Sequence, residues 1–335
     1  MIKKLGSKKS FFTSPLKFLV HWRSLPPYEM ISYIFMYASV PMLAYGIQLY
    51  DINTIRVIIF TVLTLYAGFF AALIWNDITD ADIDSVAYPD RPIPSGRISK
   101  KKFFIIALFF SALVFIFATL ISPICLIIVC AAALFVSFHD KYLKKRVKIP
   151  AYSEIFTPVQ WVVVAVFGFF AIWTAIPQST SISINLSILG TINTNKSAII
   201  QMIILVLFTY FADNAHDLAE GIVDAEGDKK HGVRTYATSF GAKNAASVSF
   251  VWFLISGILG VILFYTTILS FVFLVLFIIL WLYIMFYSYK LLKSDKKDIK
   301  KIGAIVGRKG FDYFLFSYNL IFLDVLIQIV ILNFY

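Results

Sequence analysis

Charged residues are scarce in this chain, and the two signs are unevenly represented. Only 15% of its 335 residues are Asp, Glu, Lys or Arg, whereas 60% are hydrophobic. A soluble globular domain of this length carries more charge and fewer apolar residues, so the composition excludes that class. Together with a mean hydropathy of +0.82, it indicates a protein that crosses a membrane several times.

Cysteine is nearly absent, and histidine is rare. The chain has two cysteines, Cys125 and Cys130, and four histidines. The two cysteines lie within one apolar run at a spacing that fits neither a zinc site nor a disulfide framework. We therefore expect both to be small buried residues, and any metal site has to draw mainly on oxygen ligands.

Several apolar runs approach the length of about 20 residues that a helix needs to cross a bilayer. They lie near residues 30–49, 55–75, 103–121, 122–138, 154–174, 198–212, 247–267, 269–288 and 311–333. No linker is long enough to divide the chain, so we expect one integral membrane domain over residues 1–335. The predicted fold class is all-α: a polytopic membrane protein with about nine transmembrane helices around a central cavity.

Basic residues alternate along the predicted spans. Of the 30 Lys and Arg residues, 28 lie in segments 3–23, 76–102, 139–150, 214–246 and 290–309, and only Arg56 and Lys196 lie elsewhere. By the positive-inside rule, these segments face the cytoplasm, with the N-terminus inside and the C-terminus outside. Residues 1–28 would form a basic cytoplasmic N-terminal arm. The formal net charge of +11 then indicates topology and contact with anionic membrane lipid, not binding to nucleic acid.

Carboxylates gather in two of the inner segments, 76–102 and 214–246. On a helix, a rotation of about 100° per residue places four polar side chains of the first cluster on one face: Asn76, Asp77, Asp80 and Asp84. The same rotation places five carboxylates of the second cluster on one face: Asp213, Asp217, Glu220, Asp224 and Asp228. A tandem duplication of a four-helix unit, with a ninth helix appended, would set the two acidic faces opposite each other across the cavity.

Such clusters are either solvated loop charges or ligands of a cation. Like-charged carboxylates repel one another along a helix, and unpaired charge near a bilayer costs free energy, so we expect a partner that neutralises them. Oxygen ligands without useful cysteine favour Mg2+ over Ca2+. Because Mg2+ keeps coordination positions for phosphate oxygens, two acidic faces predict two or more ions that clamp a diphosphate.

Basic residues follow both clusters and fill the loop between them. They are Arg91, Arg97, Lys141, Lys144, Lys145, Arg146, Lys148, Lys229, Lys230 and Arg234. Each could bind a phosphate oxygen or a lipid headgroup.

A diphosphate held at the mouth of a lipid-facing bundle has its organic part in the membrane, which describes a polyprenyl diphosphate. Bound Mg2+ would stabilise the departing pyrophosphate.

The two acidic clusters also resemble known signatures. Asn76-Asp77-x-x-Asp80-x-x-x-Asp84, followed by Arg91-Pro92-Ile93-Pro94-Ser95-Gly96, resembles the first signature of the UbiA superfamily of intramembrane prenyltransferases. The stretch from Asp224 to Thr235 is similar to the second signature, and Tyr142-x-x-Lys145-Arg146 is similar to the basic motif before the fifth helix. The resemblance covers essentially the whole chain, including the number of spans.

This resemblance implies roles for individual residues. The implied catalytic residues are Asp80, Asp84, Asp224 and Asp228. They would organise Mg2+ together with Asn76, with Asp77 and Asp217 in support. The implied diphosphate contacts are Arg91, Lys145, Arg146 and Lys229. The prenyl chain would run toward a lateral opening to the bilayer.

We therefore expect Mg2+-dependent transfer of a prenyl group from an isoprenyl diphosphate to an unidentified acceptor, aromatic or alcohol, with release of pyrophosphate. The alternative within this fold is a terpene cyclase that acts on a prenyl diphosphate without a second substrate. Glu220 stands where relatives that prenylate 4-hydroxybenzoate carry a tyrosine, so the acceptor stays open. A cation transporter is disfavoured because the carboxylates sit at predicted helix ends.

Three further titratable residues stand out. Asp324 lies near the middle of the last predicted span, where a charged group is usually paired or turned to a cavity. We expect it to hydrogen-bond within the bundle, and the alternatives are a contact with the acceptor or proton abstraction. His216 and His231 flank the second cluster and could act as a base or be loop residues without a function.

Overall fold

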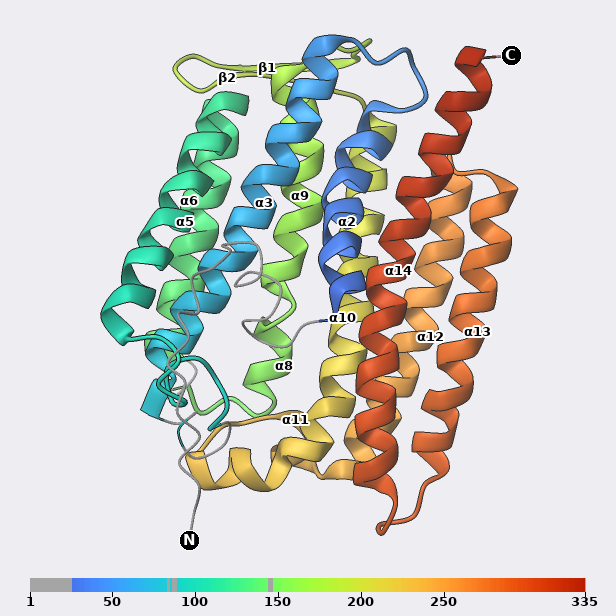
Figure 1. Ribbon diagram of the computed structural model, residues 1–335. Helices are drawn as coiled ribbons and strands as arrows, with labels where there is room; N and C mark the ends of the chain where they lie inside the picture. Colours follow the sequence, from blue (N-terminus) through green and yellow to red (C-terminus); the bar gives the residue numbers. More distant parts are fainter. Residues whose placement is uncertain (1–25, 83–84, 86–88, 144–146, 335) are drawn as a thin grey trace, which may run out of the picture.

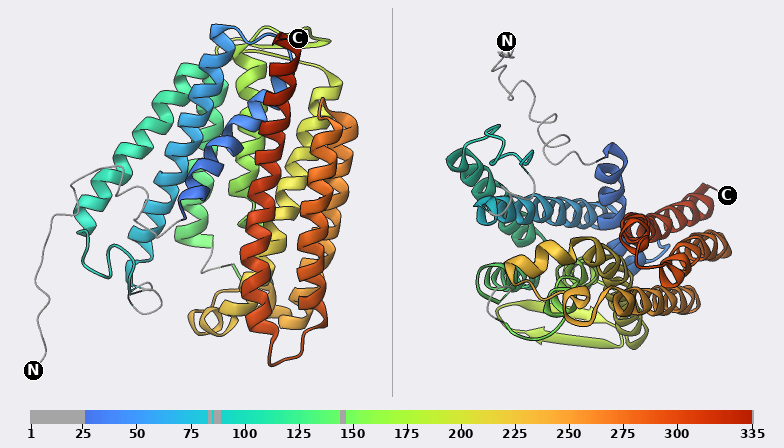
Figure 2. Two further views of the ribbon diagram at one scale, coloured as in Figure 1. Left: turned by 45° about the vertical axis from the view of Figure 1, so that its right-hand side comes forward. Right: turned by 90° about the horizontal axis from the view of Figure 1, so that it is seen from below.

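The computed structural model describes residues 26–82, 85, 89–143 and 147–334, and most of these residues are helical (Figure 1). The long helices are α2 (Pro27–Tyr45), α3 (Ile52–Thr79), α5 (Lys100–Ile121), α6 (Pro123–Phe138), α9 (Val159–Ala175), α10 (Lys196–His231), α12 (Ala242–Thr266), α13 (Phe271–Lys293) and α14 (Ile299–Phe334). The shorter elements are a π-helix η1 (His139–Leu143), α8 (Tyr152–Phe156), α11 (Tyr236–Phe240) and an antiparallel hairpin of β1 (Ile182–Leu186) and β2 (Gly190–Thr194). The hairpin lies at the upper end of the bundle and α11 at the lower end (Figures 1 and 2).

The prediction of an all-α membrane fold is confirmed. Among the described residues, seven helical segments are long and apolar enough to cross a membrane: α3, α5, α10, α12, α13, α14 and the segment Tyr152–Ala175 that contains α8 and α9. Helix α6 is apolar but has 16 residues, and α2 has Glu29 and Pro41 among its 19 residues. The nine predicted apolar runs therefore correspond to nine long helices in the part of the chain that the structure describes.

Two helices extend well beyond the predicted spans. The run near 198–212 belongs to α10, which continues to His231, and the run near 311–333 belongs to α14, which begins at Ile299. Apolar residues mark only the part of a helix that faces lipid or core, so a polar extension is invisible to hydropathy. Gly232 ends α10 in the left-handed conformation, with φ +72 and hydrogen bonds from its N–H to the carbonyl oxygens of Asp228 and Lys229.

Polar capping residues begin the helices at the upper end of the bundle. The Asp51 side chain accepts a 2.7 Å hydrogen bond from the Thr54 N–H at the start of α3. The Asn195 side chain accepts a 2.8 Å bond from the Ala198 N–H at the start of α10. Such caps satisfy backbone donors that have no partner inside the helix. Both helices start at the upper end of the bundle and finish at the lower end (Figure 1).

The two cysteines of α6 are free. Cys125 is buried and Cys130 is partly buried. Ser122 caps α6 by accepting a 3.1 Å bond from the Cys125 N–H, and the Thr174 hydroxyl bonds to the Ser122 hydroxyl at 2.7 Å. The expectation of a small buried residue is confirmed fully for Cys125 and in part for Cys130.

Three glycines of α14 allow it to lie close against α10. A Cβ atom on Gly303 would be 3.0 Å from the Ala219 carbonyl oxygen, and one on Gly307 would be 2.3 Å from Cγ of Glu220. A Cβ atom on Gly310 would be 2.7 Å from Cβ of His216. Small residues are the usual means by which helices approach closely in membranes. The glycine face of α14 thus covers the beginning of the second acidic cluster.

Asp324 hydrogen-bonds within the bundle, as predicted. It is buried, and its carboxylate accepts hydrogen bonds from the Ser270 N–H at 2.9 Å and the Phe273 N–H at 3.3 Å, as well as from the Ser270 hydroxyl. Gln328 donates a further bond at 2.8 Å. Asp324 lies beside the turn that begins α13, where it satisfies free N–H groups.

Candidate active site at the lower end of the bundle

The first acidic motif lies at the lower end of α3 (Figure 1). Asn76 and Asp77 belong to the last turn, and Asp80 follows as the C-cap, with its N–H bonded to the Asn76 carbonyl oxygen at 2.9 Å. Asp77 is 1% exposed, whereas Asn76 and Asp80 are partly buried. Asp84 lies outside the described residues, so its place on this face stays a prediction.

Arg91 contacts the first motif through Asp77. Its Nη1 atom is 3.5 Å from Oδ1 of Asp77, and its side chain is 26% exposed. A turn orients this region: the Ser95 N–H bonds to the Arg91 carbonyl oxygen at 3.0 Å, and Gly96 adopts φ +69, which glycine accommodates without strain. A buried carboxylate requires a compensating charge. Arg91 supplies that charge and lies where a guanidinium could also reach a phosphate oxygen.

The second acidic motif lies on α10 and becomes more exposed toward its C-terminus. Asp213 is 1% exposed, and the side chains of Asp217 and Glu220 are 23% and 50% exposed. Asp224 is exposed and Asp228 is partly buried. Because α10 is helical through all five positions, the helical geometry that predicted a shared face applies to them. The carboxylates run from the interior of the bundle to its lower surface.

Other charged residues near the end of α10 point elsewhere. The carboxylate of Glu226 forms an ion pair with Lys300 of α14. Lys229 is exposed, so its predicted diphosphate contact stays a prediction. Lys145 and Arg146 lie outside the described residues.

His216 is enclosed by carboxylates. Its Nε2 atom is 3.0 Å from Oδ1 of Asp213, and its Nδ1 atom is 3.6 Å from Oδ1 of Asp217 and 3.9 Å from Oε1 of Glu220. Its side chain is only 6% exposed. The interpretation of His216 as a loop residue is therefore wrong, because α10 is longer than predicted and α14 covers it. In the described part of the chain, His216, Asp217 and Glu220 are the one group of three His, Cys, Asp or Glu residues whose ligand atoms all lie within 4.8 Å of one another.

Aromatic rings adjoin His216. The Phe311 ring is 5.3 Å from the imidazole, centre to centre, in a T-shaped arrangement. Trp161 of α9 lies 6.4 Å from Phe311 and 6.0 Å from Tyr33 of α2, and Tyr33 lies 4.4 Å from Phe69 of α3. Composition alone could not identify these rings, because aromatic residues are abundant throughout the chain. The cluster shows where aromatic faces from α2, α3, α9 and α14 meet beside the acidic motif.

Glu154 of α8 contributes a further carboxylate that the sequence did not reveal. It is 5% exposed, and its Oε1 atom accepts a 2.7 Å hydrogen bond from the Tyr236 N–H. Its Oε2 atom is buried without a hydrogen-bond partner. Gly221 of α10 makes room for it, since a Cβ atom there would be 3.1 Å from Oε1. The only sequence signal is a single acidic residue at the start of an apolar run.

The segment before α8 is docked on the residues that follow the second motif. The Ala151 N–H bonds to the Ser239 hydroxyl at 3.1 Å, and the Ser153 N–H bonds to the Arg234 carbonyl oxygen at 3.3 Å. Arg234 also donates from Nη1 to the Lys148 carbonyl oxygen at 2.8 Å. Arg234, one of the basic residues that could bind a phosphate oxygen, thus joins two loops.

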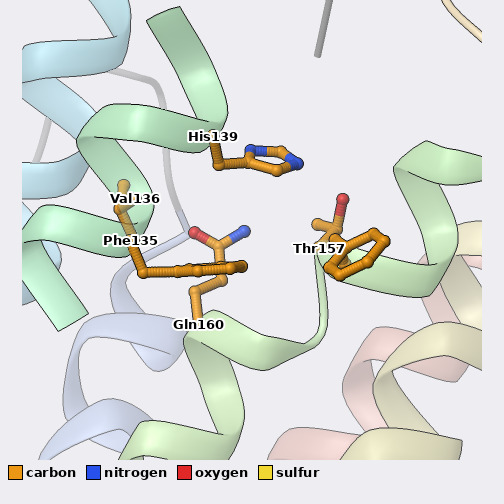
Figure 3. A pocket seen from close by; sticks show the side chains of 6 residues that line it. Phe135, Val136, His139, Thr157 and Gln160 are labelled. Atoms are coloured by element: carbon orange, nitrogen blue, oxygen red, sulfur yellow. The ribbon is translucent and has the colours of Figure 1, made fainter. Parts of the chain in front are cut away.

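His139 helps to anchor the same segment. Its ring stacks between Phe135, at 5.9 Å, and Tyr152, at 5.5 Å. A cavity of about 10 Å3, lined also by Thr157 and Gln160, lies beside it, as Figure 3 shows. A space of this size holds about one water molecule, so it is too small for a substrate.

A larger apolar groove of about 210 Å3 lies between α2, α3 and α14. Its lining includes Met42, Tyr50, Ile55, Phe322 and Ile329. These residues belong to the upper ends of the helices, whereas both acidic motifs lie at the lower ends (Figure 1). The groove is therefore separate from the acidic site.

The donor atoms around the two motifs fit Mg2+. The described members of the predicted ligand set are Asn76, Asp77, Asp80, Asp217, Asp224 and Asp228, and every one offers oxygen. Mg2+ prefers such ligands and retains water or phosphate at the remaining positions. In addition, Oδ2 of the buried Asp213 has no hydrogen-bond partner, which shows that this region holds uncompensated acceptors.

Comparison with known proteins gives a family match and several similar structures. Residues 34–306 match the UbiA prenyltransferase family. The chain is 27% identical over 190 residues to the digeranylgeranylglyceryl phosphate synthase of Sulfolobus acidocaldarius, and the match covers 56% of this chain and 57% of that protein. The chain thus matches little more than half the length of this relative.

Two solved structures share the fold. A UbiA homologue from Aeropyrum pernix K1 matches with a TM-score of 0.66 at 16% identity, over 90% of this chain and 99% of that one. A UbiA homologue from Archaeoglobus fulgidus bound to DMAPP and Mg2+ matches with a TM-score of 0.53 at 15% identity, over 86% and 96% of the two chains. At such low identity these matches show a common architecture.

Proposed function

We propose a function on the premise that this chain belongs to the UbiA prenyltransferase family. It transfers a prenyl group from an isoprenyl diphosphate to an acceptor in the membrane, using Mg2+ bound between the two acidic motifs. One observation supports this most: α3 and α10 both carry an acidic motif to the same end of the bundle. A related structure from Archaeoglobus fulgidus, bound to DMAPP and Mg2+, is consistent with the proposal.

We assign the catalytic roles to Asp80, Asp84, Asp224 and Asp228, which would hold Mg2+ together with Asn76, with Asp77 and Asp217 in support. When bound, Mg2+ would stabilise the negative charge of the pyrophosphate as it leaves. Arg91 would bind a diphosphate oxygen while it keeps contact with Asp77. Lys145, Arg146 and Lys229 would supply further positive charge to the same group.

The aromatic cluster beside His216 suits the prenyl part of the donor. As the bond from the allylic carbon to the diphosphate oxygen breaks, positive charge develops on that carbon. The faces of Tyr33, Trp161 and Phe311 attract positive charge. Tyr33 is buried and the other two rings are partly buried, so they would limit the access of water that would hydrolyse the donor. These rings would therefore orient the allylic end next to the acidic motifs.

We propose an alcohol acceptor that carries a glyceryl phosphate group. This follows the name of the Sulfolobus acidocaldarius relative, a digeranylgeranylglyceryl phosphate synthase. In this reaction the acceptor hydroxyl oxygen bonds to the allylic carbon, the hydroxyl loses its proton, and pyrophosphate departs. The numerous basic residues of the lower end would favour an anionic acceptor.

The charge distribution supports one membrane orientation. We propose that residues 1–335 form a single integral membrane domain with its active site on the cytoplasmic side, and that residues 1–28 are a basic cytoplasmic arm. The N-terminus would lie inside and the C-terminus outside. Segments 76–102, 214–246 and 290–309, which hold most of the Lys and Arg residues, would then contact anionic lipid.

The test is a product assay on detergent-purified protein with Mg2+. The donors are diphosphates of 5, 10, 15 and 20 carbons, offered first alone and then with geranylgeranylglyceryl phosphate or an aromatic acid. The proposal predicts little pyrophosphate without acceptor and an ether product with the glyceryl phosphate. Formation of a hydrocarbon or terpenol from the donor alone would instead establish the terpene cyclase. Prenylation of the aromatic acid alone would refute the glyceryl phosphate acceptor.

A further inference from the structure

The imidazole of His216 has two different sides. On one side, Nε2 lies 3.0 Å from Oδ1 of Asp213, which is a normal hydrogen-bond distance. On the other side, Nδ1 faces Oδ1 of Asp217 at 3.6 Å and Oε1 of Glu220 at 3.9 Å. These distances are too long for hydrogen bonds, and Nδ1 has no hydrogen-bond partner although the side chain is buried.

This arrangement is one that a metal ion would satisfy. In the neutral tautomer in which Nε2 donates its hydrogen to Asp213, Nδ1 carries a lone pair and lies 3.6 and 3.9 Å from two carboxylate oxygens. A carboxylate that orients a histidine through the far ring nitrogen is a regular feature of metal sites. For bonds of about 2.1 Å, ligand atoms of one ion lie about 3.0 to 3.4 Å apart. The two distances from Nδ1, 3.6 and 3.9 Å, are longer than this range, and all three ligand atoms lie within 4.8 Å of one another. Rotation of the half-exposed Glu220 side chain would bring its carboxylate oxygen closer to the other two ligand atoms.

The proposed ligands are accessible to solvent on one side and packed against α14 on the other. Glu220 and Asp217 are 50% and 23% exposed, so the ligand oxygens can be reached from the lower surface. On the inner side, Phe311 lies against the imidazole and Gly310 brings α14 to the Cβ atom of His216. The three ligand atoms therefore leave coordination positions open only toward the exposed side.

We propose that Nδ1 of His216, with carboxylate oxygens of Asp217 and Glu220, binds one divalent transition-metal ion such as Mn2+, Co2+ or Zn2+. An imidazole ligand favours these ions over Mg2+. The site shares Asp217 with the predicted Mg2+ ligand set, and it does not include Asn76, Asp80, Asp224 or Asp228. Asp213 is the positioning residue that orients the imidazole. This inference rests on the geometry of α10 and does not depend on prenyl transfer.

The test is pulsed electron paramagnetic resonance of Mn2+ bound to metal-free, substrate-free protein that has been purified without a histidine tag. We expect modulation from one directly bound imidazole nitrogen, which persists when Mg2+ is added in excess. His216→Gln removes the nitrogen signal. His139→Gln, a buried histidine on η1, is the matched control and retains it. Asp224→Asn also retains it, because that carboxylate belongs to the Mg2+ motif.

Two results would overturn the site. The first is the absence of nitrogen modulation in the wild-type protein, which would mean that the imidazole itself serves as the cation among these carboxylates. The second is an unchanged signal in folded His216→Gln. Asp213→Asn provides a further measurement, and we expect its Mn2+ affinity to fall by about 10 to 100-fold. Binding is measured without a prenyl donor, so failure of the proposed prenyl transfer would not affect it, nor the reverse.

Discussion

Oε1 of Glu154 accepts a hydrogen bond from the Tyr236 N–H at 2.7 Å, and this bond joins α8 to the segment that follows the second acidic motif. The two residues are 82 positions apart in the chain, and the bond is partly buried. Glu154 also presents its backbone oxygen to the side chain of Asn214 on α10. Glu154 thus joins α8 both to the beginning of the second acidic motif and to the segment that follows it.

Glu154→Ala should destabilise the protein and impair catalysis. The substitution leaves the Tyr236 N–H without its acceptor, at a cost of about 1 to 3 kcal/mol in the free energy of unfolding. Thermal denaturation in detergent measures this loss of stability. A fall in kcat would show that catalysis depends on the position of α10 that Glu154 supports. Glu226→Gln is the control, because it removes an exposed carboxylate of α10. We expect it to change neither stability nor kcat measurably. Equal stability of the two variants would contradict the anchoring role.

Arg91 and Asp77 should behave as a coupled pair. Removing Arg91 takes away an ion-pair partner of the buried Asp77 carboxylate, whereas removing both groups also removes the charge that needs compensation. In a double-mutant cycle with Arg91→Ala and Asp77→Asn, we expect a coupling free energy of about 1 to 3 kcal/mol in stability. Arg91→Ala should also raise KM for the diphosphate donor. If the destabilisation by the double variant equals the sum for the two single variants, the contact between Arg91 and Asp77 does not contribute to stability.

Gly310→Ala should be disruptive, because no space exists for a methyl group. A Cβ atom there would lie 2.6 Å from Cζ of Phe253 and 2.7 Å from Cβ of His216. Overpacking of this kind costs about 1 to 3 kcal/mol. Gly227→Ala is the matched control, since nothing lies within 4 Å of the added atom on α10 and alanine favours helix. Similar melting temperatures for both variants would refute the close contact of α10 and α14.

Asp324 should matter for stability and not for chemistry. Asp324→Ala removes the acceptor for the Ser270 and Phe273 N–H groups at the start of α13, and we expect a loss of about 1 to 3 kcal/mol. Asp324→Asn keeps an acceptor oxygen and should lose less. The prenyl-transfer rate per folded molecule should be unchanged in the Asn variant. A folded but inactive Asn variant would instead indicate contact with a substrate.

The sequence was sufficient to predict the parts of the fold and site that depend on local patterns. Apolar runs mark the helices, and the spacing of Asp213, Asp217 and Asp224 already indicates one helical face. The surroundings of His216 and Glu154 could not be predicted in this way. Both are buried by contacts between elements distant in sequence, and hydropathy does not show which helices touch.

The partners of Asp324 illustrate the same limit. The apolar run around Asp324 predicts that it lies within the last span, but its partners depend on where α13 begins. The boundaries of α10 and α14 were also misplaced, because a helix continues beyond its apolar part wherever caps and partner helices support it. The glycines of α14 supply that support for α10.

The most direct test of the central claim is Mg2+-dependent pyrophosphate release by Asp228→Asn, measured beside the wild-type protein with geranylgeranyl diphosphate and geranylgeranylglyceryl phosphate. The substitution keeps the size of the side chain of Asp228 on α10 but removes the charge that would hold Mg2+. We expect a folded, membrane-inserted variant whose turnover falls by at least about 100-fold, with Asp80→Asn behaving alike. Wild-type turnover in either purified variant would contradict the assignment of the acidic motifs as the catalytic site.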